Sequence, residues 1–169
     1  SFPATRGQTM ETASASPESN KVTGYILRKP DDAPEYIRRD LGNGAWVSVR
    51  AITSAELDEI TAEVHSLTQD IRAGHAAAVL VASMLAHDVR PDMLENEVYV
   101  MSLQERLTRF RVAMRVIGEW EGIYDSDKVA LDPKNELHVS LFMLDSAWSQ
   151  IVAETAYRCV HKVIAEKKG

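Results

Sequence analysis

The sequence predicts a mainly helical α+β domain with a small N-terminal two-stranded β element and a flexible N-terminal arm. Its composition is typical of a globular chain, because 45% of the 169 residues are hydrophobic and 26% are charged. Residues 45–52 alternate between apolar and polar, which indicates a half-buried strand. From Thr53 onward apolar residues recur every three or four positions, as on the buried face of a helix. We expect residues 1–20 to form the arm, residues 21–166 a single domain and residues 167–169 a tail.

The arm is rich in Ser, Thr and Pro, and Phe2 is its one aromatic residue. Such a segment offers too little apolar surface to offset the entropy that it would lose on ordering. The chain starts with Ser1. Met10 is an alternative native start, in which case residues 1–9 would be of non-native origin.

The β element is expected to pair residues 22–28 with residues 45–52. Pro30 should end the first strand, because proline cannot donate a hydrogen bond to a ladder. Between the strands we expect one helical turn at residues 35–41 and a tight turn at residues 42–44, Gly-Asn-Gly.

The first two expected helices follow this element directly. Thr53 and Glu56 have the spacing of a capping box, and Gly74 is well placed to end the helix that they begin. Residues 75–87 are nearly all apolar, which predicts a second helix at the centre of the core, with a short helical piece starting at Pro91.

The later helices are predicted by similar patterns. Ser102 and Glu105 repeat the capping-box spacing at the expected start of a third helix. An aromatic link at residues 120–124 should follow it. Asp132 is then expected to cap a helix with Pro133 in its first position. The last helices are expected at residues 136–144 and 147–166.

No pattern in the sequence indicates a catalytic residue, a cofactor or a metal ion. Cys159 is the one cysteine, which excludes an internal disulfide and a cysteine-only zinc cluster. No two histidines lie three or four residues apart, so no helix offers a histidine pair to a metal. Asp125, Asp127 and Glu136 have the spacing of three calcium ligands, but an Ala stands where the calcium loop needs its glycine. We therefore expect a protein that is not an enzyme.

The charges favour protein partners over nucleic acid or a membrane. The net charge is −6, whereas nucleic-acid binding depends on Lys and Arg. No apolar run approaches the roughly 18 residues that cross a bilayer, and no secretory signal is present, so we expect a cytoplasmic protein. Tryptophans are expected in the core first, although they are also common interface anchors.

The acidic and basic residues are segregated along the chain. Residues 53–73 hold five acidic side chains and one basic one, whereas residues 103–120 hold four arginines and two glutamates. The two helices could pair weakly within one fold, or they could meet between chains and orient self-association. A third interpretation makes the arginine face a nucleic-acid patch. The candidate residues for partner binding or self-association are Arg106, Arg109, Arg111, Arg115, Trp120, Glu56, Glu59 and Glu63.

Two stretches resemble a known family, the tail assembly chaperones of long-tailed bacteriophages and related small tail proteins of prophages. Residues 46–56, WVSVRAITSAE, are similar to the family pattern V-x-V-R-x-I/L-T, which leads into a capped helix. Residues 116–125, VIGEWEGIYD, with residues 132–137, DPKNEL, are similar to V-x-x-W-x-G-V/I-x-D followed by a turn and a short helix. The similarity spans residues 45 to about 148. The turn after the tryptophan differs from the family pattern, and the first 44 residues have no counterpart.

This resemblance implies a non-enzymatic function in the host bacterial cytoplasm. Such chaperones coat the helical tape-measure protein, keep it soluble and help to recruit tail-tube subunits. The tape-measure and tail-tube proteins are thus the implied partners, with self-association of the chaperone as a further possibility. The alternatives are a structural virion protein, such as a tail terminator or head–tail connector subunit, and a small DNA-binding regulator.

Overall fold

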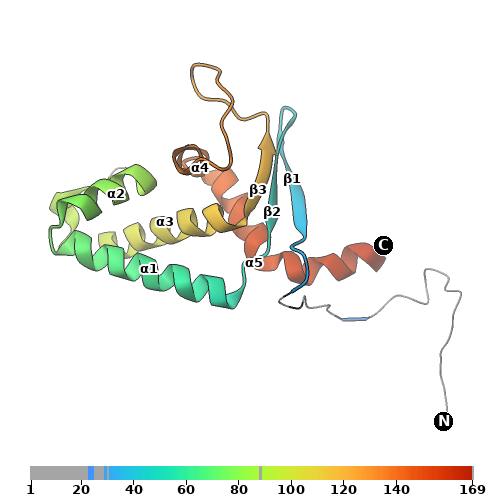
Figure 1. Cartoon of the computed structure of the whole chain (residues 1–169), viewed down its shortest axis with the longest axis horizontal. Helices are drawn as coiled ribbons and strands as arrows, with labels where there is room; N and C mark the ends of the chain where they lie inside the picture. Colours follow the sequence, from blue (N-terminus) through green and yellow to red (C-terminus); the bar gives the residue numbers. More distant parts are fainter. Residues whose placement is uncertain (1–22, 25–28, 30, 88, 169) are drawn as a thin grey trace, which may run out of the picture. The chain divides into compact units, whose positions relative to one another are not determined.

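The structure is a computed structural model that describes residues 23, 24, 29, 31–87 and 89–168, with side chains as far as Tyr157. The described part holds five α-helices and a three-stranded antiparallel sheet, so the predicted α+β class is confirmed (Figure 1). The chain divides into two units, of which Ala33–Cys159 is the larger and contains every feature discussed below. The predicted arm lies outside the described residues. So does the predicted strand at residues 22–28, apart from a bend at residues 23 and 24.

The sheet has the strand order β1-β2-β3, with β1 at Tyr36–Gly42, β2 at Ala45–Arg50 and β3 at Ile117–Glu121. The strand predicted at residues 45–52 is confirmed as β2, whose alternate residues Ala45, Val47 and Val49 are buried. The predicted tight turn is also confirmed, because Asn43 and Gly44 both have positive φ, 54° and 80°. Positive φ at both positions is what a two-residue hairpin turn requires.

Two parts of the sheet differ from the prediction. Residues 35–41 do not form a helical turn but the strand β1, because they pair with β2 along its length. The link predicted at residues 120–124 does not begin at Trp120, because residues 117–121 form the strand β3, which pairs Val47 with Trp120 and Val49 with Ile117. Both errors have one cause, since pairing with a distant segment overrides weak local preference.

Both predicted ends of the first helix are confirmed. Helix α1 spans Ser54–Arg72, and Thr53 and Glu56 form both hydrogen bonds of the capping box. Gly74 follows the helix with φ of +82°, a conformation that glycine adopts without strain. The second helix, α2, spans Ala76–Ala86 and is followed by a short 3-10 helix, η2, at Pro91–Met93.

The last two helices lie within two residues of their predicted ranges, whereas the third starts earlier than predicted and the cap of the fourth differs. Helix α3 spans Glu97–Val116 and is capped by Asn96, whose side chain accepts from the Tyr99 N–H, so it begins more than one turn before Ser102. Helix α4 spans Glu136–Met143, and its cap is Asn135 rather than Asp132. In both cases an asparagine, which is as good a cap as serine or aspartate, lies nearer to the first packed turn. Helix α5 spans Ser146–Lys168.

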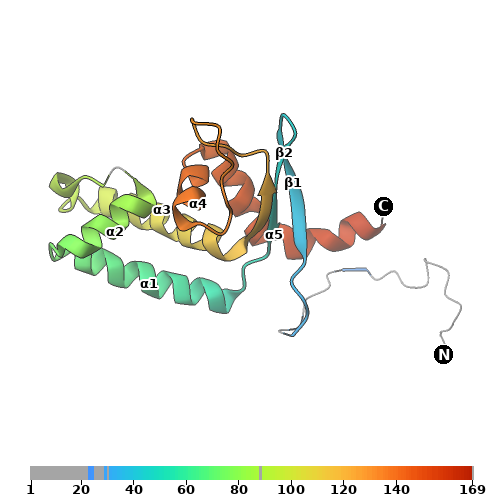
Figure 2. The same ribbon diagram turned by 45° about the horizontal axis from the view of Figure 1, so that its top comes forward.

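The core lies between the helices and the inner face of the sheet. Trp120 of β3 stacks on Phe142 of α4 at a ring distance of 4.9 Å, and Phe142 contacts Trp148 of α5 at 5.1 Å. The Trp120 indole N–H donates to the Leu131 carbonyl at 2.8 Å. Figure 2 shows α4 between the sheet and α2. The aromatic stack therefore joins the sheet to the two C-terminal helices.

Candidate protein-binding surface

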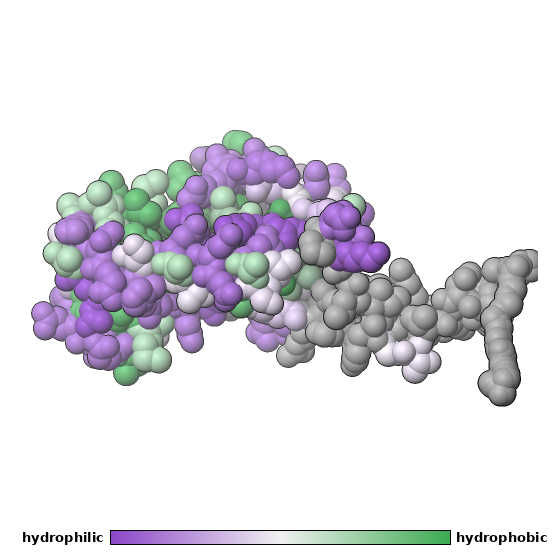
Figure 3. Space-filling model, turned by 60° about the horizontal axis from the view of Figure 1, so that its bottom comes forward, coloured by the Kyte–Doolittle hydropathy of each residue, from purple (hydrophilic) through white to green (hydrophobic). Residues whose placement is uncertain are grey.

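The clearest candidate for a binding surface is the outward face of α2. Its exposed side chains Leu80, Val81 and Met84 retain 63%, 38% and 44% of their accessible surface. We call these three residues the α2 patch. Figure 3 shows hydrophobic residues gathered at the end of the molecule that holds α2. Helix α2 is therefore apolar on both sides, which is the pattern of a buried helix, but only one side is covered.

The prediction that α2 lies at the centre of the core is thus wrong. Only its inner side is buried, through Ala78, Ala82, Leu85 and Ala86. This side packs on α1, α3 and α4. Large apolar side chains that cluster on a surface are typical of a site that binds another protein.

Side chains from two neighbouring helices hold the C-terminal end of α2. The hydroxyl of Ser140 on α4 lies 3.1 Å from the Met84 carbonyl and 3.2 Å from the Leu85 carbonyl. The Arg106 guanidinium on α3 donates from Nη1 to the carbonyls of Ala86, at 2.8 Å, and His87, at 2.9 Å. These are the carbonyls that a helix end leaves without partners. Helix α2 is therefore anchored by polar contacts while its apolar patch faces outward.

A second apolar surface lies on α4. Leu137, Leu141 and Leu144 are exposed and follow the spacing i, i+4, i+7, which places them on one face. We call them the α4 stripe. Beside it, a hollow of about 560 Å³ is lined by residues that include Tyr124, Leu141 and Trp148. An eight-residue helix that buries one apolar face and exposes another is suited to packing against a further helix.

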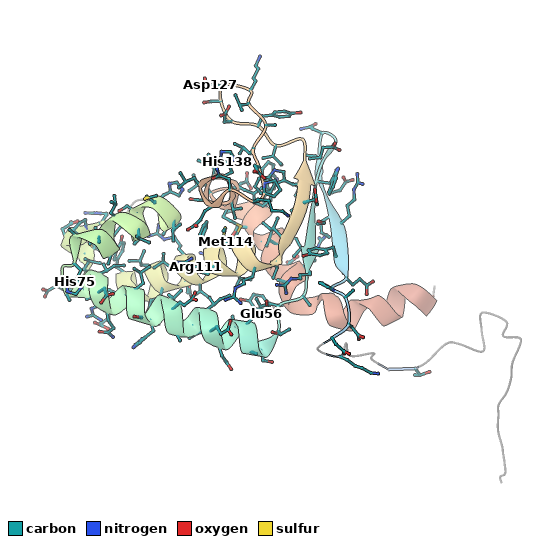
Figure 4. All side chains as sticks on the ribbon, viewed as in Figure 1. Glu56, His75, Arg111, Met114, Asp127 and His138 are labelled. Carbon is teal, nitrogen blue, oxygen red and sulfur yellow. The ribbon has the colours of Figure 1, made fainter. Side chains whose placement is uncertain are left out.

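The structure brings three of the predicted charged residues together within the chain. Arg115 on α3 lies 3.1 Å from the Glu59 carboxylate and 3.8 Å from that of Glu56, both on α1. Figure 4 labels Glu56 at the start of α1 and Arg111 midway along α3. The acidic and basic helices therefore neighbour each other in one fold, which is the first of the interpretations offered above. Charge pairing between chains stays a prediction.

The remaining predicted residues lie in different surroundings. Trp120 is buried in the aromatic stack, and Arg106 anchors α2. Arg109 and Glu63 are exposed on α3 and α1, and Arg111 is half-buried. Two of the four arginines thus contact neighbouring helices in the chain, which reduces the basic surface open to nucleic acid.

The best-defined electrostatic feature is the ion pair of Arg50 and Glu56. The two side chains form a bidentate contact at 2.7 and 2.9 Å, and Glu56 also accepts from the Thr53 N–H at 3.1 Å. The hydrogen bond from Arg50 lowers the pKa of Glu56 to about 2, against the opposing effect of partial burial. This contact joins the end of β2 to the first turn of α1.

We expect Glu56→Gln to remove an acid-sensitive contribution to stability. The folded-state pKa lies below the ordinary value of 4.5. The contribution is therefore complete above about pH 5 and is lost as the pH falls toward 2. A shift of this size corresponds to about 3 kcal/mol. In urea unfolding, the wild type should exceed Glu56→Gln by that amount at pH 6 and match it near pH 2.

Glu59→Gln is the matched control for this measurement. The Glu59 side chain is 64% exposed, compared with 21% for Glu56. Exposed ion pairs contribute about 0–1 kcal/mol to stability. The free energy of unfolding of the control should therefore fall little at any pH. Equal losses for the two variants would contradict the assignment of the acid-sensitive term to Glu56.

The two stretches that resemble the tail-chaperone family lie side by side in the sheet. Val47 and Val49 of the first stretch pair with Trp120 and Ile117 of the second. These paired residues are buried. These paired residues therefore belong to the core of the fold, whereas the α2 patch lies outside both stretches.

Comparison with known proteins adds no relative. No family model, no curated protein and no solved structure matches this chain.

The described part of the chain offers neither a metal cluster nor a membrane span. Among these residues no cluster of three or more His, Cys, Asp or Glu side chains could hold a metal ion. The Asp125 carboxylate instead accepts from the N–H groups of Asp127 and Val129, at 2.8 and 2.9 Å, and so closes a turn. None of the described helices is both long and apolar enough to cross a bilayer.

Proposed function

We propose that this protein is a non-catalytic assembly chaperone of a long-tailed phage or prophage. It would act in the host bacterial cytoplasm, where it would bind the helical tape-measure protein and promote the addition of tail-tube subunits. The observation that carries the proposal is the α2 patch, in which Leu80, Val81 and Met84 face outward on an anchored helix. The resemblance of residues 46–56 and 116–137 to tail assembly chaperones supplies the biological setting.

The chemistry of the patch suits a helical partner. A tape-measure helix that is not yet enclosed by the tail tube exposes apolar stripes, which promote aggregation. Leu80 and Met84 are four residues apart and can insert into such a stripe, as in helix-to-groove recognition. Release during tube assembly requires modest affinity for each copy of the chaperone. Binding of many copies along one partner can then supply a high overall avidity.

Co-expression with the tape-measure protein of the same genome tests this proposal. We expect the wild type to keep the tape measure in the soluble fraction and Leu80→Glu/Met84→Glu to lose that effect. Both substituted side chains are exposed, so the variant should keep its helical circular dichroism. The soluble share of the tape measure, measured after centrifugation, should fall at least fivefold.

Ser66→Glu is the control, because Ser66 is an exposed residue on α1 and is not part of the α2 patch. It should solubilise the tape measure as the wild type does. A tape measure that stays insoluble with the wild type, or that the double variant solubilises equally well, contradicts the proposal. Closed rings of the wild type in light scattering would instead favour a structural virion subunit.

A further inference from the structure

A cavity of about 460 Å³ with a mixed polar and apolar lining lies where the C-terminal end of α2 meets α3, α4 and α5. Its polar lining residues are His87, Arg106, Arg109, Ser140, Ser146, Ser149 and Gln150. Leu85, Phe110 and Leu144 supply apolar wall. Among the described residues, no Asp or Glu belongs to this lining. The cavity is therefore basic and partly apolar in a protein whose net charge is −6.

Two guanidinium groups line this cavity from successive turns of α3. Arg106 uses Nη1 for the carbonyls of Ala86 and His87, which leaves its other N–H groups for a further partner. Arg109 is exposed, and it forms no ion pair with any other described residue within 4.0 Å, Glu105 included. The cavity thus holds more positive charge than its own walls neutralise.

The first turn of α5 adds hydroxyl groups to this cavity. Ser146, the first residue of α5, and Ser149 both line the cavity. The N-terminus of a helix carries partial positive charge, which favours a nearby anion. Asp145 precedes this turn, and its carboxylate accepts from the Trp148 N–H at 3.0 Å, so it offsets the partial charge of the helix start. The arginines and the serine hydroxyls are therefore the groups that favour an anion in this cavity.

We propose that this cavity binds a carboxylate that carries an apolar group. The planar guanidinium of Arg109 would pair with the carboxylate, because arginine donates two parallel hydrogen bonds to such a group. Ser149 and Gln150 would donate further hydrogen bonds. The apolar part of the ligand would contact Phe110 and Leu144. The carboxylate could belong to a free organic acid or to an acidic side chain of a bound polypeptide, and neither case depends on the chaperone function proposed above.

Titration of the full-length protein with hexanoate tests the proposal, with amide chemical shifts in NMR as the measurement. We expect saturable shifts confined to the amides around the cavity, including those of His87, Ser149 and Gln150. Hexanamide has the same chain without the charge and should bind at least tenfold more weakly. Inorganic phosphate has the charge without the apolar chain and should also bind at least fivefold more weakly.

Variants on α3 show which arginine is responsible. Arg109→Gln should weaken hexanoate binding at least tenfold, and it should fold normally because Arg109 is exposed. Arg111→Gln is the matched control on the same helix, outside the cavity lining, and should leave binding unchanged. Arg106 is kept intact because it anchors α2.

A last arm of the experiment distinguishes the two sources of the carboxylate. A blocked Leu-Glu dipeptide, whose one carboxylate is its side chain, should bind more tightly than hexanoate if the natural ligand is a polypeptide, and more weakly if it is a free acid. Either order supports a carboxylate site. Equal binding of hexanamide and hexanoate, full binding by Arg109→Gln, or shifts spread over the whole surface would overturn the proposal.

Discussion

Phe142→Ala is expected to lower the free energy of unfolding by about 3–5 kcal/mol, the range for removing a large buried aromatic side chain. Phe142 is 2% exposed and lies between two indole rings, at 4.9 Å from Trp120 and 5.1 Å from Trp148. The substitution removes both ring contacts at once and leaves a cavity between β3, α4 and α5. The cavity adds to the lost transfer free energy, because the packed elements around it relax only in part.

Urea unfolding followed by tryptophan fluorescence measures this effect directly, since Trp120 and Trp148 flank the substituted ring. Leu141→Ala is the matched control, because Leu141 is the exposed neighbour on the same helix. It should change the free energy of unfolding by less than about 1 kcal/mol, as surface substitutions usually do. If Phe142→Ala cost no more than the control, the aromatic stack would not be the contact that joins the sheet to α4 and α5.

The helices were easier to predict than the sheet, and the residues involved show why. The start of α1 depends on Thr53 and Glu56, three residues apart, so its capping box was visible in the sequence. Strand β3 depends on partners some seventy residues earlier, such as Val47 for Trp120. Strand β3 follows helix α3 directly, and no turn residues in the sequence mark where the helix ends and the strand begins. Prediction from short-range pattern therefore took Trp120 as the start of a link and missed the strand β3.

The candidate site shows the same limit. The charge segregation was visible, but only the structure shows that Arg115 meets Glu59 within the chain. The α2 patch was hidden because a uniformly apolar helix has the same sequence whether one side or both are covered. The α4 stripe was hidden for the same reason. Leu137, Leu141 and Leu144 form a second apolar face, which the sequence shows equally for a helix that is covered on both sides.

The basic cavity could not be predicted from any single segment. Arg106 and Arg109 were predicted as part of an arginine face, but Ser149 and Gln150 lie some forty residues later. The two groups meet only where α5 comes together with α3 at the end of α2. That meeting depends on tertiary contacts, for which periodicity gives no indication.

Gly122→Ala is expected to lower the free energy of unfolding by about 2–5 kcal/mol, and a comparison with Gly74→Ala separates the two causes. Both glycines have φ of +82°, where a side chain costs about 1–2 kcal/mol. At Gly74 a new Cβ would meet nothing within 4 Å. The free energy of unfolding of that variant should therefore fall only by the cost of positive φ. At Gly122 it would lie 2.9 Å from the Ala45 Cα, a backbone atom of β2, which adds about 1–3 kcal/mol for overpacking.

The difference between these two variants tests what the glycine in the tail-chaperone pattern does. If its role is to let the end of β3 approach β2, Gly122→Ala should cost at least about 1 kcal/mol more than Gly74→Ala in urea unfolding. The same variant, assayed at a temperature where it remains folded, should still solubilise the tape measure, because the α2 patch lies on another element. If the two variants lose equal free energy of unfolding, the close approach to Ala45 does not explain why residue 122 is a glycine. Loss of solubilisation by folded Gly122→Ala would place partner binding at the sheet instead of at α2.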